Sequence, residues 1–574
     1  TRHLEGLVEA VVGEVPEDVA AQLRLQPPKD RKFGDLALGC FPLAKLRKSA
    51  PPKIAAELAA AFAPDDVLES AVATGPFVNF RFRRSALAEY VVTGVRDGVA
   101  PFGPAKSTGE VIVIDYSSPN IAKPFHMGHL RSTVIGSALC KIHRHLGHEV
   151  HGINHLGDWG SQFGKIITAF RHWGSDAELE ASPMRHLFEI YVRYGREAKE
   201  DPALDEESAE NFRRLESGED NDERRLWERL RDISLAAFEG PYERLGVEFD
   251  HFTGESFYED KMEAAIGRVA EAGILETSEG AEVVAFGDDM PPCILRKSDG
   301  TTIYATRDLA AIFHRLETFH FDRALYVVGS EQKLHFQQLR EVARKLGLPE
   351  AEHIEHVPFG LILAKNEESG KWEKFATRGG NAIFLDEVLD EAVANVRKII
   401  SEKNPHLEDA DAVAEQVGVS AIVFNDLKNS RIKDVKFDWE SMLNFEGETG
   451  PYVQFAVARL SGILRNADRL DDDGGEGFGS SDVDWALLED AEQVLLTMLE
   501  FGPAVERASA QNEPSVITSL MIDLAGDIHS YLRDHHVLGA EDAVRDARLA
   551  LVAAARSMLK TGLGLLGVAA PDRM

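Results

Sequence analysis

Two histidines three residues apart, His126 and His129, are the clearest candidates for chemistry in this chain. They lie in SSPNIAKPFHMGH (117–129), with Lys123 just before them. Imidazole N–H groups can donate hydrogen bonds to phosphate oxygens, and donors held in place count most where charge develops in a transition state. A pair of polar residues that cap a helix would give the same short motif. The pattern therefore indicates either a phosphate site or a helix cap.

The segments around the histidines predict a strand, a helix and a second strand. EVIVIDYS (110–117) is an apolar run typical of a buried parallel strand, GHLRSTVIGSALCKIHRHLG (128–147) has helical spacing, and EVHGINHLG (149–157) returns to a strand. Such a unit predicts a doubly wound parallel sheet, in which ligands bind beyond the carboxyl ends of the strands. The histidines lie at that end, where Gly128 permits close approach of a ligand and the helix N-terminus favours phosphate.

Shifts in composition divide the chain into parts. The expected parts are a small α+β domain at 1–105, a Rossmann-like α/β core at 106–395 with a charged helical insertion around 170–250, a helical connective region at 396–450, and an all-α helix bundle at 451–574. Residues 27–38 are expected to form a turn that leads into a helix. Strands are expected at 75–82, 280–286, 293–306, 324–329 and 357–363.

The distribution of charge bears on possible partners. A net charge of −33 over 574 residues argues at first against a nucleic-acid partner. Acidic residues concentrate in 196–225 and 471–492, however, and basic residues cluster at 29–53, 81–84 and 428–436. Local basic patches of this kind can still bind RNA.

The cysteines and the apolar runs narrow the class of protein further. Cys40, Cys140 and Cys293 stand apart and form no CxxC pair, so neither a disulfide framework nor a cysteine zinc site is expected. No apolar run approaches the roughly 20 residues that span a bilayer, and the first residues do not have the pattern of a signal peptide. A cytoplasmic protein that does not associate with membranes is the simplest interpretation.

Several stretches together resemble one family. SSPNIAKPFHMGHLRST (117–133) is similar to the arginyl form of the HIGH signature of class I aminoacyl-tRNA synthetases. Four later stretches resemble the arginyl-tRNA synthetases in the same order, namely 296–311, 326–339, 448–460 and 547–574. The resemblance implies an arginine–tRNA ligase, which activates L-arginine with ATP to arginyl-adenylate and transfers arginine to tRNA(Arg), releasing pyrophosphate and AMP.

The resemblance implies that the histidine motif is the ATP site. His126, Gly128 and His129 would bind the phosphates while the arginine carboxylate attacks the α-phosphate in line. Positioning and charge stabilisation would dominate this step, because no acid–base catalysis is required. The implied cofactor is Mg²⁺, bound together with ATP, and no zinc or other metal site on the protein is expected.

The second signature of the family, KMSKS, is degenerate in this chain. Its expected place is KWEKFATRGG (371–380), where Lys374 fits the first lysine and Thr377 replaces the second. The lost lysine usually meets the pyrophosphate side of ATP. We expect Lys123 to supply the missing cation, with help from Arg378.

The substrate side chain sets a separate requirement. A guanidinium carries a permanent charge and five donors in a fixed plane, so it needs carboxylates around it. By resemblance these carboxylates would be Asp308 and Glu255, and Tyr304 would share the helix face of Asp308. The other implied arginine contacts are Asn120 and Asp115, at the α-amino and carboxylate end, and Gln332.

Two regions would hold the tRNA. The N-terminal part resembles the domain that contacts the D-loop corner, with Phe77 and Asn79 as candidates for base stacking and hydrogen bonding. The C-terminal part resembles a DALR-type anticodon-binding domain, in which the candidates are Tyr452, Phe455, Arg459 and Met574. The family is usually monomeric.

Other interpretations make different predictions. A nucleotidyltransferase outside translation would be a short chain without the last 120 or so residues. A cysteinyl-type class I synthetase would place zinc ligands near the site, which the scattered cysteines do not provide. A tRNA-binding paralogue without catalysis would have damage in HMGH or at Asp308, and Thr377 alone favours it.

Overall fold

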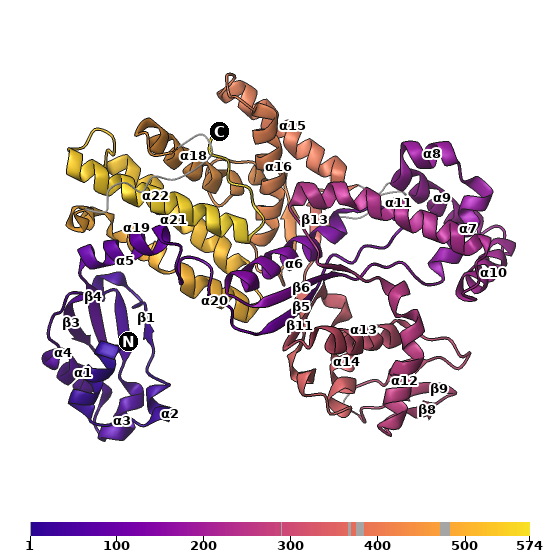
Figure 1. Ribbon diagram of the computed structural model, residues 1–574, viewed down its shortest axis with the longest axis horizontal. Helices are drawn as coiled ribbons and strands as arrows, with labels where there is room; N and C mark the ends of the chain where they lie inside the picture. The colour runs from indigo at the N-terminus through magenta and orange to yellow at the C-terminus, as the bar shows by residue number, and fades with distance from the viewer. Residues whose placement is uncertain (1, 289, 366–368, 375–383, 471–482) are drawn as a thin grey trace. The chain divides into compact units, whose positions relative to one another are not determined.

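A computed structural model gives the structure of the chain and describes residues 2–288, 290–365, 369–374, 384–470 and 483–574. The chain packs into two compact units. The first contains Thr1–Gly103, Leu460–Phe501 and Gly526–Met558, and the second contains Pro104–Arg459, Gly502–Ala525 and Leu559–Met574. Figure 1 shows their helices and strands in colours that follow the chain.

A parallel sheet with strand order β12-β11-β5-β6-β7 forms the core of the second unit. Its strands are β5 (Val111–Asp115), β6 (Glu149–Asn154), β7 (His251–Phe252), β11 (Arg323–Gly329) and β12 (Ile354–Phe359). The chain first extends the sheet from β5 through β6 to β7, and then adds β11 and β12 on the other side of β5. The carboxyl ends of β5 and β11 therefore form the switch point at which ligands bind in such sheets. This confirms the predicted doubly wound core.

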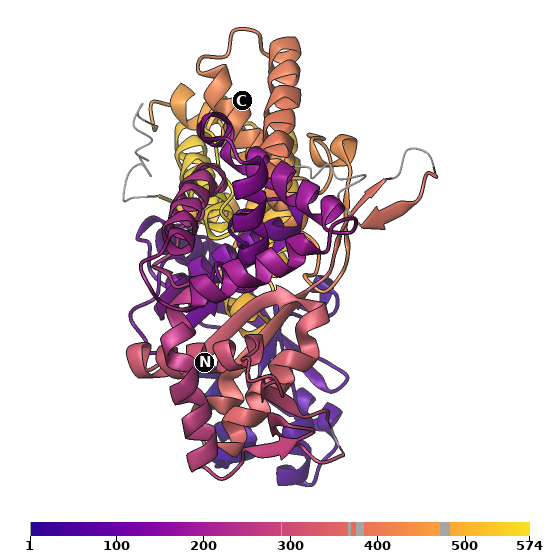
Figure 2. The same ribbon diagram turned by 90° about the vertical axis from the view of Figure 1, so that its right-hand side faces the viewer.

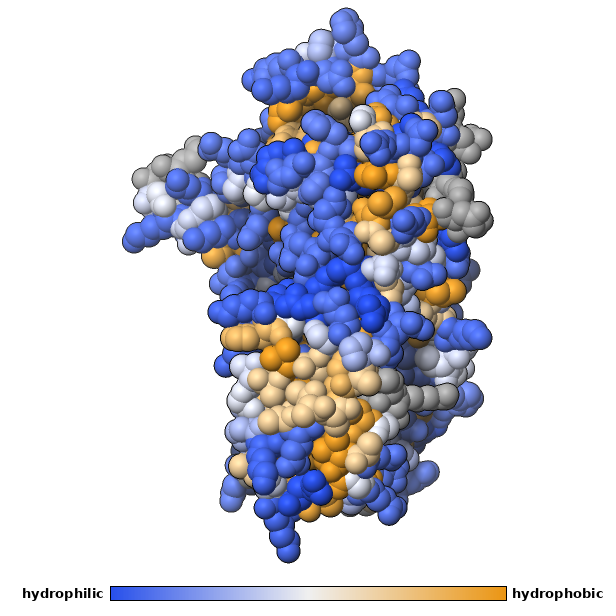
Figure 3. All heavy atoms as spheres, turned by 90° about the vertical axis from the view of Figure 1, so that its left-hand side faces the viewer, coloured by the Kyte–Doolittle hydropathy of each residue, from blue (hydrophilic) through white to orange (hydrophobic). Residues whose placement is uncertain are grey.

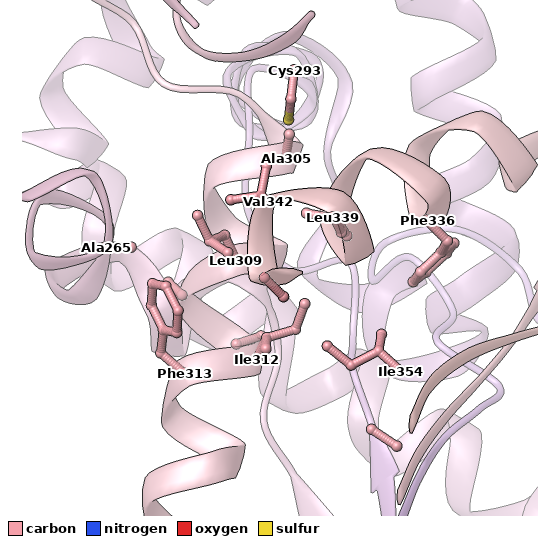
Figure 4. Packing of buried hydrophobic residues seen from close by; sticks show 14 of the residues in the cluster. Ala265, Cys293, Ala305, Leu309, Ile312, Phe313, Phe336, Leu339, Val342 and Ile354 are labelled. Atoms are coloured by element: carbon pink, nitrogen blue, oxygen red, sulfur yellow. The ribbon is translucent and has the colours of Figure 1, made fainter. Parts of the chain in front are cut away.

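Helices pack on this sheet. α6 (Met127–His145) connects β5 to β6, α13 (Tyr304–Phe319) precedes β11, α14 (Lys333–Lys345) connects β11 to β12, and α12 (Met262–Glu271) lies beside α13. Apolar side chains at helical spacing on α13 and α14 meet in one buried cluster (Figure 4), which includes Leu309, Ile312, Leu339 and Val342. The cluster holds α13 against β11, so the residues at the start of α13 have a fixed position.

The charged stretch between β6 and β7 is helical. Its helices are α7 (Gln162–Trp173), α8 (Asp176–Ala181), α9 (Pro183–Glu197), α10 (Ala203–Glu216) and α11 (Asp222–Leu245). Glu223 is 1% exposed and lies 2.9 Å from Arg171 and 3.2 Å from Arg214. A buried carboxylate of this kind is stable only when paired, so the pairing ties α11 to α7 and α10.

Smaller sheets and helices complete the second unit. They are β8 (Glu276–Ser278), β9 (Ala281–Val284), β10 (Cys293–Arg296), β13 (Ile362–Lys365), β14 (Trp372–Lys374), β15 (Val435–Phe437), η2 (Glu255–Lys261), η3 (Ser330–Gln332), η4 (Pro349–His353), α15 (Leu385–Lys403), α16 (Ala410–Leu427), α17 (Trp439–Met442) and α20 (Phe501–Gln511). β13 pairs with β14 and with β15. Figure 2 shows the hairpin of β13 and β14 extending away from the neighbouring helices.

The first unit contains an antiparallel sheet with strand order β1-β2-β4-β3. Its elements are β1 (Leu25–Gln26), β2 (Leu36–Gly39), β3 (Leu68–Thr74), β4 (Phe77–Phe82), α1 (Arg2–Val12), α2 (Glu17–Ala20), η1 (Arg31–Phe33), α3 (Phe41–Arg47), α4 (Pro51–Ala61), α5 (Arg84–Arg96), η5 (Trp485–Ala491) and α19 (Glu492–Leu499). Leu43, Ile54, Leu58, Val78 and Phe80 are among its buried core residues. Figure 3 shows a broad apolar area in the lower half of one face of the molecule.

The last part of the chain contains three long helices, α18 (Gly450–Asn466), α21 (Ser515–Asp534) and α22 (Asp542–Leu565). With α19 and α20 they confirm the predicted all-α C-terminal part. Among the residues that the structure describes, no helix combines the length and the apolar character needed to cross a bilayer.

Some local predictions were wrong. Residues 293–306 form a strand only as far as Arg296, and Tyr304 already begins α13. The run at 357–363 is broken at Gly360 into β12 and β13, which belong to different sheets. Residues 27–38 lead through a short 3-10 turn into the strand β2 rather than into a helix. In each case the local sequence was compatible with more than one structure, and pairing with distant segments decided between them.

Candidate active site

His126 and His129 lie where α6 begins. His126 is the N-cap residue, and its Nδ1 accepts a hydrogen bond from the backbone N–H of Gly128 at 2.9 Å. The backbone N–H of His126 donates to Nδ1 of His129 at 3.2 Å, and the two rings stack with centroids 4.0 Å apart. A side chain at position 128 would collide with the His126 ring, since a Cβ there would lie 2.6 Å from Cε1. The histidines therefore form a helix cap through their Nδ1 atoms, and the Nε2 atoms take no part in these capping contacts.

The hydrogen bonds assign the protons of both rings. A neutral imidazole has one N–H and one acceptor nitrogen. Because Nδ1 accepts a backbone N–H in both rings, the proton of each neutral ring must be on Nε2. Burial lowers the pKa of His129 to about 3, with help from His126 and Lys123, and burial and Lys123 also lower the pKa of His126. Near neutral pH the pair therefore presents two neutral Nε2–H donors.

The segment between β5 and α6 has an unusual backbone that is held firmly. Ser117, Ser118 and Ala122 have φ values of 71°, 49° and 58°. The N–H of Ser117 donates to Oγ of Ser132 at 2.9 Å, and the N–H of Ala122 donates to Oγ of Ser234 at 3.0 Å. Non-glycine residues with positive φ persist where surrounding contacts over-determine them, as at many functional sites.

A pocket of about 410 Å³ opens at the switch point of the sheet. Val327, Val328 and Gly329 at the end of β11 form one wall. The predicted site residues that line it are Asn120, His126, Gly128, His129, Gln332 and Lys374. The pocket therefore brings together predicted ATP-binding and arginine-binding residues that are up to 254 positions apart in the chain, from Asn120 to Lys374.

Two lysines lie near the histidines. The Nζ of Lys123 lies 5.5 Å from the centre of the Tyr191 ring, and burial lowers the pKa of Lys123. Lys374 ends β14, and it lowers the pKa of His126 together with Lys123. The positive charge of Lys123 thus acts on both histidines, and that of Lys374 acts on His126. Thr377 and Arg378 lie outside the residues that the structure describes.

Asp308 lies in the second turn of α13, one turn after Tyr304. Nε2 of His335 lies 2.6 Å from Oδ2 of Asp308, and Nε2 of His155 lies 3.9 Å from Oδ1. Burial raises the pKa of Asp308, but the hydrogen bond from His335 and nearby positive charges outweigh it, so the pKa is lowered overall. The Tyr304 ring contacts the His335 ring edge to face, with centroids 4.8 Å apart, and Tyr304 is 59% exposed. Tyr304 and Asp308 therefore share one face of the helix.

Glu255 begins the 3-10 helix η2. Its Oε2 lies 3.3 Å from Nη1 of Arg307. The pKa of Glu255 is raised to about 7, because burial, together with the nearby charge of Asp308, outweighs the opposite effect of Arg307. Asp308 and Glu255 are thus close enough to influence each other, and an arginine of the chain itself pairs with one of them.

Other predicted arginine contacts are engaged within the protein. Oδ2 of Asp115 lies 2.7 Å from Nη2 of Arg315, which is 1% exposed, and Oδ1 accepts a hydrogen bond from Ser118 at 3.1 Å. Oδ1 of Asn120 accepts a hydrogen bond from Gln162 at 3.4 Å. Asp115 is therefore bound on both oxygens by neighbouring side chains, whereas Asn120 lines the pocket.

The predicted tRNA residues lie in different surroundings. The Phe77 ring meets the Phe41 ring edge to face with centroids 5.7 Å apart, and Phe41 is 56% exposed. Asn79 is 4% exposed, and its amide donates to the carbonyl of Val72. Phe455 on α18 is 44% exposed. The carbonyl of Met574 accepts a hydrogen bond from Asn404 at 3.3 Å, and its side chain packs against a core cluster around α15 and α16. Tyr452 and Arg459, also on α18, are partly buried.

Sequence reasoning missed several residues that shape the site. His335 orients Asp308, Arg307 pairs with Glu255, and Arg131 lines the pocket. All three occur in the stretches that carried the family resemblance, at 117–133, 296–311 and 326–339. Their chemistry depends on partners far away in sequence, which the motif alone does not name.

Within the described part of the chain, no group of three or more His, Cys, Asp or Glu side chains could hold a metal ion. The carboxylate of Glu331 is nevertheless among the groups that line the pocket. Mg²⁺ usually binds through phosphates and one or two carboxylates rather than through a protein cage. The pocket is therefore compatible with an ion that enters together with a nucleotide.

Comparisons with known proteins agree over the whole chain. Residues 98–439 match the family described as "tRNA synthetases class I (R), catalytic domain", residues 453–574 match the "DALR anticodon binding domain", and residues 2–82 match the "Arginyl tRNA synthetase N terminal domain". The chain is 44% identical to an arginine–tRNA ligase of Exiguobacterium sibiricum, covering 98% of both chains. It is 45% identical to an arginine–tRNA ligase 1 of Bacillus cereus, covering 100% of this chain and 99% of that one. The solved arginyl-tRNA synthetase of Thermus thermophilus has 27% identity and a TM-score of 0.81, with 99% and 100% covered.

Proposed function

Since the chain belongs to the arginyl-tRNA synthetase family, we propose how its own residues carry out the arginine–tRNA ligase reaction of that family. The reaction joins L-arginine to ATP as arginyl-adenylate with release of pyrophosphate, and then transfers arginine to tRNA(Arg) with release of AMP. The observation that carries the proposal is the pair of neutral Nε2–H donors of His126 and His129, in a pocket at the switch point of the sheet.

The first step is a displacement at phosphorus. An oxygen of the arginine carboxylate forms a bond to the α-phosphorus of ATP, and the bond from that phosphorus to the bridging oxygen of pyrophosphate breaks. Negative charge develops on the phosphate oxygens, where preorganised donors and cations stabilise it most. His126 and His129 supply donors there, Gly128 allows the phosphates to approach, and Lys123 and Lys374 supply positive charge.

Mg²⁺ is the proposed companion of ATP. When bound, it neutralises charge on the phosphate oxygens. The protein group proposed to assist it is the carboxylate of Glu331, which lines the pocket. Thr377 and Arg378 are proposed to contact the pyrophosphate side, and Lys123 is proposed to replace the cation that Thr377 lacks.

Recognition of arginine is assigned to the region around the start of α13. Asp308 is held charged by His335, and together with Glu255 it is proposed to bind the guanidinium. Tyr304 would pack against the same group, and Asn120 and Gln332 would contact the α-amino and carboxylate end. Asp115 is proposed to act at that end as well, by holding Ser118 and Arg315 in place.

The tRNA is proposed to bind through two regions. The first is an N-terminal tRNA-corner domain at 1–105, with Phe77 and Asn79. The second is a DALR-type domain at 451–574, with Tyr452, Phe455, Arg459 and Met574. Between them in the sequence are a catalytic domain at 106–395 and a connective region at 396–450. A monomer in the cytoplasm is part of the proposal.

ATP–pyrophosphate exchange with each amino acid, with and without tRNA(Arg), tests the proposed function. We expect exchange with arginine alone among the amino acids. Exchange that is equal with lysine, or absent with every amino acid when tRNA(Arg) is present, would overturn the proposal.

A further inference from the structure

Arg131 joins the histidine helix to a distant part of the second unit. It lies two residues after His129 on α6, lines the pocket and is 1% exposed. Its Nε donates to both carboxylate oxygens of Asp426 on α16, at 2.8 and 3.0 Å. Its Nη1 donates to the backbone carbonyl of Lys433 at 2.8 Å. One guanidinium therefore fixes both the end of α16 and the segment that follows it.

The segment after α16 is bound in turn to the break between β12 and β13. The N–H of Leu361 donates to Oδ1 of Asp434 at 2.7 Å, and the N–H of Val435 donates to the carbonyl of Leu361 at 2.8 Å. Gly360 approaches so closely that a Cβ there would lie 2.7 Å from the carbonyl carbon and oxygen of Lys433. The backbone next to the carbonyl held by Arg131 is thus packed directly against the start of β13.

β13 carries this position on to Lys374. β15 pairs in parallel with β13, so that Lys436 lies opposite Leu363, and β13 pairs antiparallel with β14, so that Leu363 lies opposite Lys374. Lys374 is the third residue in a row across these three strands. The backbone of Lys374 is therefore connected to α6: β13 and β15 link it to Asp434 and Lys433, and Arg131 on α6 holds the carbonyl of Lys433.

We propose that Arg131 and Asp434 are positioning residues for adenylate formation, which set the place of Lys374 relative to His126 and His129. This inference rests on the proposed function, because it assumes that Lys374 and the histidines act on the same ATP. Residues 428–436, which the sequence marked as a basic cluster open to RNA, thereby acquire a structural task. Within that segment Arg431 donates to the carbonyls of Pro358 and Asn512, and Lys428 donates to the carbonyl of Glu448.

The choice of variant matters for the test. Removing Arg131 leaves the carboxylate of Asp426 buried without its partner, which destabilises a protein strongly, so R131A can lose activity simply by unfolding. Asp434 is exposed, and so is Leu361, whose N–H donates to it. D434A therefore removes the link at its surface end, and D434N keeps an oxygen that can accept the same N–H.

Asp322 provides a matched control in the same unit. Its Oδ2 accepts the N–H of Val111 at 2.8 Å, and Asp322 is exposed. This contact lies at the amino end of β5, opposite the pocket. D322A removes a comparable carboxylate–amide hydrogen bond without touching the path from Arg131 to Lys374.

The experiment is steady-state arginine-dependent ATP–pyrophosphate exchange in the presence of tRNA(Arg). We expect D434A to raise the KM for ATP by about 3- to 10-fold, the size of one lost net hydrogen bond, while the KM for arginine stays within about 2-fold of wild type. D434N and D322A should match the wild type. K374A should abolish the effect of D434A on the KM for ATP, because coupled residues do not add in a double-mutant cycle.

The outcomes separate this inference from the proposed function. A wild-type protein without arginine-dependent exchange would overturn the proposed function. An active wild type in which D434A leaves the KM for ATP unchanged, raises both KM values equally, or adds fully to K374A would overturn the positioning role alone.

Discussion

Arg307, which precedes Asp308 in the chain, places its Nη1 3.3 Å from Oε2 of Glu255. A guanidinium of the protein itself therefore pairs with one of the two carboxylates proposed to bind the guanidinium of the substrate. Burial nevertheless raises the pKa of Glu255 to about 7, so Arg307 does not compensate fully for the loss of water around this carboxylate. The charge on Glu255 then changes within the range of pH in which the enzyme can be assayed.

We expect the KM for arginine to fall as the pH rises from 6 to 8. The substrate guanidinium stays charged in this range, whereas Glu255 becomes charged above its pKa of about 7. Well below that pKa, binding must first remove a proton, which raises the KM about tenfold for each unit of pH. In E255Q the KM for arginine should be high and independent of pH. Glu259 gives a control, because burial and Glu216 also raise its pKa to about 7, and E259Q should keep the wild-type profile. The same profile in E255Q as in the wild type would exclude Glu255 from arginine binding.

The histidine pair is expected to act without titrating. Asparagine at 126 or 129 keeps an acceptor near the position of Nδ1 but removes the donor at Nε2. H126N and H129N should each lower the kcat of exchange by roughly 10²–10³-fold, as for a removed donor to a developing charge. Because burial holds the pKa of His129 near 3, wild-type kcat should show no loss from its protonation between pH 8 and 6. A step in kcat near pH 6.5 that disappears in H129N would contradict the neutral pair.

Lys123 is expected to replace the cation that Thr377 lacks. K123A should raise the KM for ATP and lower kcat, with a loss of about 2–4 kcal/mol in transition-state stabilisation. Lys141 is a suitable control, because burial also lowers its pKa. Its Nζ donates to Oγ of Ser137 and to the carbonyl of Gly246, and neither residue lines the pocket. Adenylation kinetics that are equally affected in K123A and K141A would show that the loss at Lys123 is structural.

Phe41 extends the predicted tRNA contact of the N-terminal part. It is exposed and touches the Phe77 ring, so it offers a face on which an unstacked base can lie. F41A should weaken tRNA(Arg) binding by about 1–3 kcal/mol, the usual value of one stacked base. V72A, which removes an exposed apolar side chain from the same sheet, should not change it. Equal binding by F41A and the wild type, measured by fluorescence titration, would remove Phe41 from the interface.

The sequence predicted the parts of the site that depend on local pattern. The strand–helix–strand unit around His126 and His129 followed from periodicity, and the pocket formed where parallel sheets place it. Tyr304 and Asp308 share a helix face because their spacing is four residues. By contrast, the expected strand at 293–306 failed after Arg296, because the turn that follows lets α13 begin at Tyr304.

Contacts between distant segments could not be predicted in this way. Arg131 and Asp426 are 295 positions apart, and no periodicity in either segment names the other. The run at 357–363 looked continuous because it is mostly apolar, yet the backbone of Lys433 packs against Gly360 and separates β12 from β13. The hydrogen bond from His335 to Asp308 is of the same kind, since β11 lies between the two helices in sequence.

The final prediction concerns selectivity for arginine. A hydrogen bond from His335 keeps Asp308 charged, so an uncharged analogue would leave this partly buried negative charge without the cation that arginine supplies. A site built on such groups rejects the analogue by a factor of about 10⁴ or more, and it rejects lysine because an ammonium cannot fill a planar, bidentate site. No hydrolytic editing of mischarged tRNA is then needed.

D308N should raise the KM for arginine by roughly 10- to 100-fold, the value of a hydrogen bond to a charged group, and change the KM for ATP far less. E259Q again provides the control, because Glu259 is a carboxylate on η2 that is not assigned to the pocket. The measurement is aminoacylation with arginine, canavanine, lysine and citrulline. Canavanine retains a guanidinium-like group and should be charged, whereas lysine and citrulline should not. Citrulline charging by the wild type, or an unchanged KM for arginine in D308N, would exclude Asp308 from arginine binding and with it the chemical basis of this selectivity.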